Sequence, residues 1–298
     1  MILNDVDIEI LSTLGKFECE GYINADNVST LNLPNLQQSG TITAQNATTV
    51  NLSNLQKAGE IHAKNATTVN LPNLQYSVNI NTHNATTLNL SSLQEAEGIY
   101  AYNATTVNLP NLKKSGSINA KNATTVNLPN LQESGNIYTE KATTVNLPNL
   151  QQARTIDADN AITLNLPNLQ KSGTISAENA TTVNLPNLQE AGDIFALSAT
   201  ALNLPNLQDA WTIYASKATT VNLPKLQEAI NINANKATTL NLPNLQQSGG
   251  IFANNAKKII IPSHLKNKLK RVPDDCEIIH PDLEATPKLE SFKTFFYK

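Results

Sequence analysis

The chain has 298 residues, of which 15% are charged, and its formal net charge is −3. Because so weak a field attracts neither nucleic acid nor an acidic membrane over a distance, we expect no nucleic-acid partner. No window approaches the roughly 18 consecutive apolar residues of a membrane span, and no signal-peptide pattern opens the chain. A cytoplasmic location is therefore the default expectation, and delivery by a non-classical route stays open.

The first segment, residues 1–26, carries a weakened version of the pattern that follows it. Leu14, Phe17, Gly21 and Ile23 fall in phase with the same positions of the later repeats. An open end of a repeat array would expose core and unpaired backbone. We predict that residues 1–26 form an N-terminal capping coil.

A unit of 19 residues then recurs without insertion or deletion from Asn27 to about Ile261. Its consensus reads Asn-Ala-Thr-Thr-Val-Asn-Leu-Pro-Asn-Leu-Gln-x-small-Gly-x-Ile-x-Ala-x. Strict spacing of this kind is typical of a solenoid with one coil per unit. We predict that residues 27–262 form a solenoid of about twelve coils.

The Thr-Val-Asn-Leu part of each unit predicts a first short strand. In the unit 122–140, Val126 and Leu128 alternate with Thr125 and Asn127, and this period of two places the aliphatic pair inside. Pro129 ends the strand because proline has no N–H for the next coil.

A second short strand is predicted around an isoleucine that recurs in nearly every unit, such as Ile137. The residue three positions earlier is always Ser or Ala, which indicates an inward corner without room for a larger side chain. The next position is usually Gly, but it is Arg154 or Trp211 in other units, so positive φ is not required there.

Nineteen residues are too few for a strand and a returning helix, whereas two short strands and two turns fit. The expected fold class is mostly β, with two short parallel strands per coil. In the unit 122–140, the expected inward residues are Ala123, Val126, Leu128, Leu131, Ser134, Ile137 and Thr139.

Residues 263–298 depart from the repeat and are predicted to form a C-terminal cap and tail. Ser263 is expected to be the N-cap of a short basic helix that ends at Val272, before Pro273. Residues Cys276–His280 predict one more strand, and Phe292–Lys298 is an aromatic terminus that either packs back on the solenoid or binds a partner.

The phrase Ala-Thr-Thr-Val-Asn-Leu-Pro-Asn-Leu, followed by a small-Gly pair and Ile-x-Ala, resembles the bacterial surface-antigen (BspA-like) type of leucine-rich repeat. It also resembles the receptor L-domain type. The resemblance covers about residues 8 to 281, including the segment Ile259–Leu265. It implies a right-handed leucine-rich-repeat-like solenoid, a bacterial origin, and binding of proteins, carbohydrate surfaces or host molecules.

Two surfaces are candidates for binding. The outward residues of the first strand repeat monotonously, which favours either Thr and Asn ladders that stabilise the stack or contact with a ligand that is itself periodic, such as ice or a repetitive glycan. The members at the centre of this periodic face are Thr106, Asn108, Thr125, Asn127, Thr144 and Asn146.

The second strand varies more and carries aromatic residues, which are favoured in protein interfaces and carbohydrate contacts. The simpler alternative is that aromatic residues suit any exposed strand. The expected partner-binding residues are Tyr100, Tyr138, Phe195, Trp211, Tyr214 and Phe252.

The sequence contains no motif for catalysis, a metal or a cofactor. Its histidines and two cysteines lack metal-ligand spacing, and no phosphate-binding or nucleophile motif is present. We therefore expect a non-enzymatic repeat scaffold, monomeric or weakly oligomeric, that binds a protein or carbohydrate partner in an adhesin-like or protein-interaction role. The alternatives are a periodic-surface binder of ice or repetitive glycan, and a structural spacer of about 58 Å.

Overall fold

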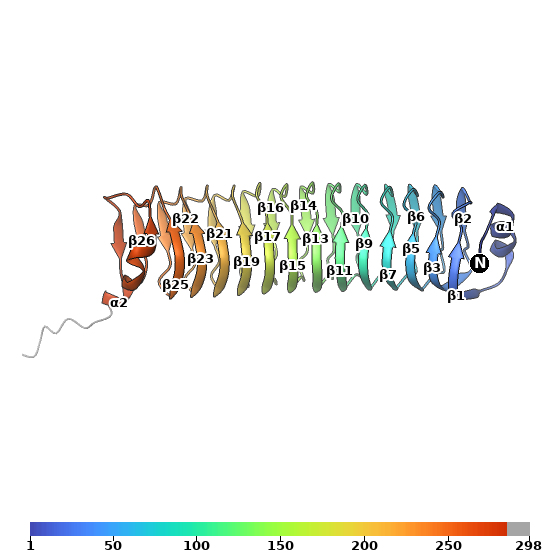
Figure 1. The fold of residues 1–298 in the computed structure, drawn as a ribbon, viewed down its shortest axis with the longest axis horizontal. Coiled ribbons are helices and arrows are strands. Elements are labelled where there is room, and N and C mark those ends of the chain that lie inside the picture. Colours follow the sequence, from blue (N-terminus) through green and yellow to red (C-terminus); the bar gives the residue numbers. More distant parts are fainter. Residues whose placement is uncertain (285–298) are drawn as a thin grey trace, which may run out of the picture.

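The chain folds into a straight rod in which successive coils stack along one axis (Figure 1). The structure is a computed structural model, and it describes residues 1–284. It is a mostly β, parallel solenoid of about 14 turns with a spacing of about 19 residues, which confirms the expected fold class. The turns beyond the predicted twelve contain β1 (Phe17–Asn24) at one end and β27 (Leu269–Lys270) at the other.

One strand of every coil belongs to a continuous parallel sheet of 14 strands, here called the long sheet. Most of its strands have six residues. Its members are β1 (Phe17–Asn24), β3 (Leu36–Thr43), β5 (Lys57–His62), β7 (Tyr76–Asn81), β9 (Glu95–Tyr100), β11 (Lys114–Asn119), β13 (Glu133–Tyr138), β15 (Gln152–Asp157), β17 (Lys171–Ser176), β19 (Glu190–Phe195), β21 (Asp209–Tyr214), β23 (Glu228–Asn233), β25 (Gln247–Phe252) and β27 (Leu269–Lys270).

The other strand of each coil has three residues and belongs to the short-strand face, which is divided into three parallel sheets. The first sheet is β2 (Thr30–Asn32), β4 (Thr49–Asn51), β6 (Thr68–Asn70) and β8 (Thr87–Asn89). The second is β10 (Thr106–Asn108), β12 (Thr125–Asn127), β14 (Thr144–Asn146), β16 (Thr163–Asn165) and β18 (Thr182–Asn184). The third is β20 (Ala201–Asn203), β22 (Thr220–Asn222), β24 (Thr239–Asn241), β26 (Lys258–Ile260) and β28 (Glu277–Ile279).

The core consists of columns of identical residues in successive coils. Ile118, Ile137 and Ile156 are direct partners in the long sheet, and all three are fully buried. Burial of one such side chain contributes about 1.5–3 kcal/mol. The predicted inward residues of the coil 122–140 are all buried: Ala123, Val126, Leu128, Leu131, Ser134, Ile137 and Thr139.

Two tight turns close each coil. The N–H of Leu131 donates to the carbonyl of Leu128 at 3.2 Å, and the N–H of Ala123 donates to the carbonyl of Ala120 at 3.0 Å. Pro129 follows Leu128, at the position where its fixed φ favours such a turn. The coils are also joined at the turns, because the N–H of Leu128 donates to the carbonyl of Asn146 in the next coil at 3.0 Å.

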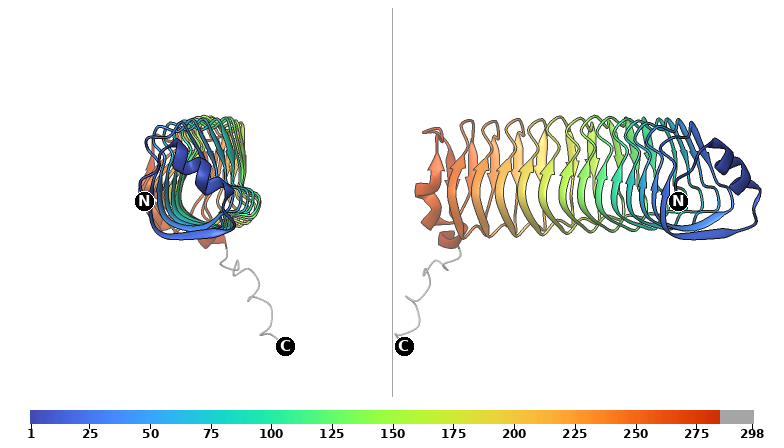
Figure 2. Two further views of the ribbon diagram at one scale, coloured as in Figure 1. Left: turned by 90° about the vertical axis from the view of Figure 1, so that its right-hand side faces the viewer. Right: turned by 45° about the vertical axis from the view of Figure 1, so that its right-hand side comes forward.

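The N-terminal end contains a helix that we did not expect, α1 (Asp5–Thr13), in front of the expected first coil with β1. Asn4 caps it, since its side chain accepts from the N–H of Asp7 while the Asp7 carboxylate accepts from the N–H of Asn4. The helix lies across the open end of the first coil (Figure 2), and its Ile8 is buried.

The C-terminal cap differs in detail from the prediction. The expected helix is a 3₁₀ helix, η1 (Ser263–Lys268), which gives way to β27 before Val272. Ser263 is not its N-cap, because its N–H and hydroxyl both donate to the Asp282 carboxylate, at 2.9 and 2.6 Å. Pro262 occupies the cap position.

The last described elements are β28, inside the segment predicted as a strand, and α2 (Pro281–Glu284). The aromatic segment Phe292–Lys298 lies outside the described residues. Among residues 1–284, no helix has the length and apolar character needed to cross a membrane.

Candidate binding groove

The strands of the long sheet bend inward at the step where a small residue precedes glycine. Ser134 and Ile137 are both buried although they lie three residues apart, so the strand cannot follow a regular alternation between them. The pairing of β11 with β13 includes Ser115 with Ser134 and Ser117 with Asn136 but omits the residues between. A bend of this kind in successive coils produces a groove along the rod.

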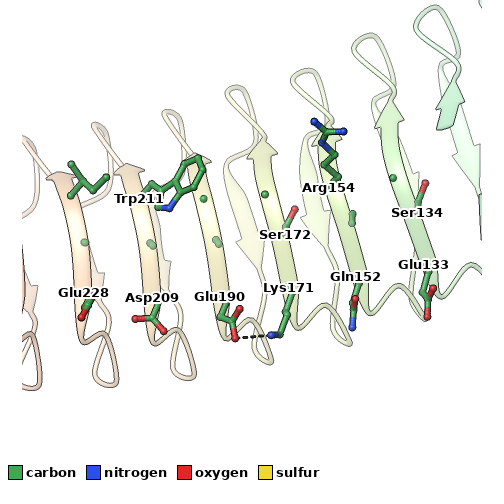
Figure 3. A pocket seen from close by; sticks show the side chains of 18 of the residues that line it. Glu133, Ser134, Gln152, Arg154, Lys171, Ser172, Glu190, Asp209, Trp211 and Glu228 are labelled. Atoms are coloured by element: carbon green, nitrogen blue, oxygen red, sulfur yellow. Dashed lines mark ion pairs between the residues drawn. The ribbon is translucent and has the colours of Figure 1, made fainter. Parts of the chain in front are cut away.

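The groove has a volume of about 1650 Å³ and runs from Tyr76 to η1. Three rows of residues line it, and Figure 3 shows its central part. The edge row is formed by the first residues of the strands: Tyr76, Glu95, Lys114, Glu133, Gln152, Lys171, Glu190, Asp209, Glu228 and Gln247. The floor row is Ala96, Ser115, Ser134, Ala153, Ser172, Ala191, Ala210, Ala229 and Ser248. The post row is Glu97, Gly116, Gly135, Arg154, Gly173, Gly192, Trp211, Ile230 and Gly249.

The glycines of the post row are explained by the close approach of the preceding coil. A Cβ atom on Gly116 would lie 2.5 Å from the carbonyl oxygen of Glu97, and one on Gly173 would lie 2.5 Å from that of Arg154. No glycine in residues 1–284 has positive φ, which confirms that backbone conformation is not the reason for glycine here. Where the post row carries a side chain, that side chain stands at the groove.

Trp211 is the most prominent of these posts. It is 64% exposed, and its Cε3 atom lies 3.4 Å from the position that a Cβ of Gly192 would occupy in the preceding coil. Gly192 is buried, whereas Gly173, one coil further away, is exposed. Ile230 follows Trp211 in the next coil and is 57% exposed. The two side chains make an exposed apolar patch on the groove.

The charges of the edge row are paired in part of the groove and unpaired in another. Lys114 pairs with Glu133 at 3.0 Å, and Lys171 pairs with Glu190 at 2.7 Å, each across adjacent coils (Figure 3 shows the second pair). Within residues 1–284, Asp209 and Glu228 form no ion pair. The groove therefore has an acidic edge beside Trp211 and Ile230.

Apart from Trp211, the predicted partner-binding residues form an aromatic row on the long sheet beside the groove, and they are half-buried. The structure brings Phe195 and Tyr214 together, with ring centroids 5.0 Å apart and planes 7° from parallel. Trp211 is separated from them because it lines the groove. The remaining members, each in its own coil, are Tyr100, Tyr138 and Phe252.

The periodic face is held together by its own amides. The side-chain amide of Asn127 donates to Asn108 at 2.8 Å, and that of Asn146 donates to Asn127 at 2.6 Å. These hydrogen bonds occupy amide N–H groups and carbonyl oxygens that would otherwise be available to a ligand. In the described chain, the outward hydroxyls of Thr106, Thr125 and Thr144 form no hydrogen bond with protein, and neither does the side-chain NH2 group of Asn108.

Titratable groups with shifted pKa values lie outside the groove. Burial, followed by the negative charges of Asp159 and Glu140, raises the pKa of Asp157 to about 6. Burial lowers the pKa of His83, which stacks on Tyr102 at 4.4 Å between ring centroids. Residues 1–284 contain no group of three or more His, Cys, Asp or Glu side chains that could hold a metal ion.

The groove itself was not anticipated from the sequence. Its signal was visible, since the small-Gly step recurs in most units. In a single unit the step indicates only an inward corner, and the groove appears when the bends of successive coils are aligned along the rod.

Comparison with known proteins finds similarity only among solved structures. No family model matches the chain, and no curated protein is significantly similar to it. A leucine-rich repeat protein from Bacteroides ovatus is 10% identical, with 87% of each chain covered and a TM-score of 0.30. A leucine-rich repeat protein from Leptospira interrogans is 13% identical, with 94% of this chain and 99% of that chain covered and a TM-score of 0.24.

Proposed function

We propose that this protein is a non-enzymatic repeat scaffold that binds an elongated macromolecular partner along its long sheet. The observation that carries the proposal is the groove beside Trp211 and Ile230, where two large apolar side chains are 64% and 57% exposed. Exposed apolar side chains grouped on one surface mark interaction sites more often than scattered ones do.

The dimensions of the groove favour a long partner. Tyr76 and Gln247 are 171 residues apart, which is nine spacings of 19 residues, or about 43 Å along the rod at about 4.8 Å per coil. A ligand of a few atoms would leave most of this length empty. A polymer chain that follows the rod would contact many coils at once.

The construction of the groove also favours recognition. Its residues belong to a hydrogen-bonded sheet whose neighbours are fixed by buried isoleucines. A surface that is ordered before contact loses little conformational freedom on binding. The stacked pair of Phe195 and Tyr214, next to the groove on the same sheet, would extend the contact area.

The proposal is tested by affinity capture with the immobilised protein and an extract of its organism of origin, followed by mass spectrometry. We expect Trp211→Ala to reduce the captured partner at least tenfold, because truncation of a central aromatic residue has the largest effects at interfaces. The double variant Tyr214→Ala with Phe252→Ala tests the aromatic row in the same way.

Ile162→Ala is the matched control, since Ile162 is also a large apolar residue, 63% exposed, but lies outside the groove. Capture that is unaffected by all the long-sheet variants would contradict the proposal. If Thr144→Lys alone abolished capture, the periodic face would be the binding surface instead.

A further inference from the structure

We propose that the part of the groove around Trp211 binds an extended polypeptide segment in which basic side chains alternate with apolar ones. This inference deepens the proposed function, on which it rests, by naming the chemistry of the partner. It depends on two features that occur together in this part of the groove.

The first feature is the apolar patch of Trp211 and Ile230, which lies beside small residues of the floor row. The indole of Trp211 lies back over Gly192, and Gly192 is buried beneath it. The next coil adds Ile230, and the floor beneath both posts is Ala191, Ala210 and Ala229. An aliphatic or aromatic side chain placed here would bury apolar surface of Trp211 and Ile230.

The second feature is the unpaired acidic edge. Asp209 and Glu228 begin the two strands that carry Trp211 and Ile230, so each carboxylate lies two residues before an apolar post. Glu133 and Glu190, at the same position of other coils, are neutralised by lysines of the preceding coils. Two adjacent carboxylates without a cation favour a partner that supplies one.

The positively charged residues of the groove lie outside this part of it. Arg154 and Lys171 line the groove on its N-terminal side, and Lys268 of η1 lines its C-terminal end. A basic partner is therefore attracted to the acidic edge and repelled on the two flanks by Arg154 and Lys268, which form no ion pair within residues 1–284. This charge pattern places the basic residues of the partner within a defined section of the groove.

The length of that section and its two unlike sides suit an extended chain. Gly192 and Lys268 are 76 residues apart, or four spacings of 19 residues, which is about 19 Å along the rod. An extended polypeptide covers this length with about six residues at about 3.3 Å each. Its alternate side chains point to opposite sides, so one set would meet the acidic edge and the other the apolar posts.

A polypeptide fits these features better than a neutral glycan. A sugar ring would stack on Trp211, but it would bring no cation to Asp209 and Glu228 and would gain little from Ile230. A segment of alternating basic and apolar residues uses all four side chains.

The test measures binding by fluorescence anisotropy with a fluorescein-labelled peptide of twelve residues that alternates lysine and leucine. Two further peptides replace lysine by glutamate or leucine by serine, and an unlabelled β-1,4-glucan hexasaccharide competes for the site. We expect the lysine-leucine peptide to bind at least tenfold more tightly than either substituted peptide, and the hexasaccharide not to displace it.

The variants locate the site. Trp211→Ala and the double variant Asp209→Asn with Glu228→Gln are each expected to weaken binding of the lysine-leucine peptide about tenfold. The controls Ile162→Ala and Glu178→Gln, at residues that do not line the groove, are expected to change it less than twofold. Unchanged circular dichroism and thermal unfolding would show that each variant is folded.

Failure of the lysine-leucine peptide to bind, equal binding of the glutamate peptide, or binding that survives the two site variants would overturn the proposal. Displacement by the hexasaccharide that requires Trp211 would assign the site to carbohydrate and would also overturn it. If the capture experiment still depends on Trp211 or the aromatic row after such a result, the proposed scaffold function stands and only the partner chemistry is wrong.

Discussion

The long sheet and the short-strand face enclose the same core, but their outward side chains interact differently between adjacent coils. On the short-strand face, Asn127 bonds to Asn108 and Asn146 through its side chain, so each coil needs the same residue as its neighbours. On the long sheet, the strands join through backbone bonds, and Tyr138 has Asn119 and Asp157 as partners. Hydrogen bonds between side chains of adjacent coils require the same residue type in each coil. Hydrogen bonds between backbones do not, so the outward residue type can differ from coil to coil.

This difference explains where recognition can develop on a rod of nearly identical coils. A residue that bonds to its copies in adjacent coils cannot change alone without leaving a partner unsatisfied. A residue whose neighbours need only its backbone can be Asn119 in one coil, Tyr138 in the next and Asp157 in the one after. The long sheet therefore carries the variable surface, and the four changes below test this division of roles.

The largest effect is expected for Gly173→Val in the post row. A Cβ there would lie 2.5 Å from the Arg154 carbonyl oxygen, so the two coils must move apart. Overpacking of this kind costs about 3 kcal/mol. The thermal unfolding midpoint of the variant should fall by several degrees relative to the original protein.

Gly21→Val is the matched control, because Gly21 occupies the same repeat position in the first coil and a Cβ there would meet no atom within 4 Å. An equal loss of stability in both variants would show that glycine is needed for its backbone and not for coil packing.

The next effect is expected for Asn127→Asp on the short-strand face. The carboxylate cannot donate to Asn108, and its charge faces an oxygen at 2.8 Å in the original protein. The loss should be about 1.5 kcal/mol in urea denaturation. Asn136→Asp on the long sheet should be nearly neutral, since the Asn136 side chain forms no hydrogen bond within residues 1–284. Equal effects on the two faces would remove the distinction between them.

Asp157→Asn should stabilise the protein at neutral pH but not at acidic pH. The pKa of Asp157 is raised from 3.8 to about 6, so the folded protein holds this proton more tightly than the unfolded chain, and its stability falls as pH rises between these values. The neutral amide avoids that loss. After allowance for solvent screening of a half-buried carboxyl, we expect a gain of about 1 kcal/mol at pH 7 and none at pH 3.5. A gain that is the same at both pH values would contradict this assignment.

The smallest effect is expected for Lys171→Met at the groove edge. Its ion pair with Glu190 spans 2.7 Å but both side chains are half exposed, so the pair contributes only about 0.3 kcal/mol. The change should lower the unfolding midpoint by less than one degree for a chain of this size. It should also free Glu190 and so strengthen binding of the lysine-leucine peptide, which anisotropy can measure.

The repeat could be predicted almost residue by residue, because its core follows local rules. Val126, Leu128 and Ile137 alternate with polar residues, and Pro129 ends a strand, so the two strands per coil follow from the sequence. The helix α1 was missed because it spans only nine residues and buries a single residue, Ile8, so its apolar periodicity is weak.

The groove could not be predicted for a different reason. The bend at Ser134 contributes to a groove only when successive coils stack, and Trp211 lies against Gly192 of the preceding coil. Neither relation is local in sequence. The position of each residue within its coil could be predicted from the sequence. Which outward residues line the groove together could not. The sequence therefore predicts one binding surface for the aromatic row and Trp211, whereas only Trp211 lines the groove.

The most direct test of the division between the two faces uses the single tryptophan of the chain, Trp211, as a reporter of the groove. Its fluorescence should be quenched efficiently by acrylamide in the free protein, because the side chain is 64% exposed. Binding of the captured partner at saturation should protect it and lower the quenching constant severalfold. A saturated complex in which Trp211 is quenched as efficiently as in the free protein would contradict the assignment of the binding surface to the long sheet groove.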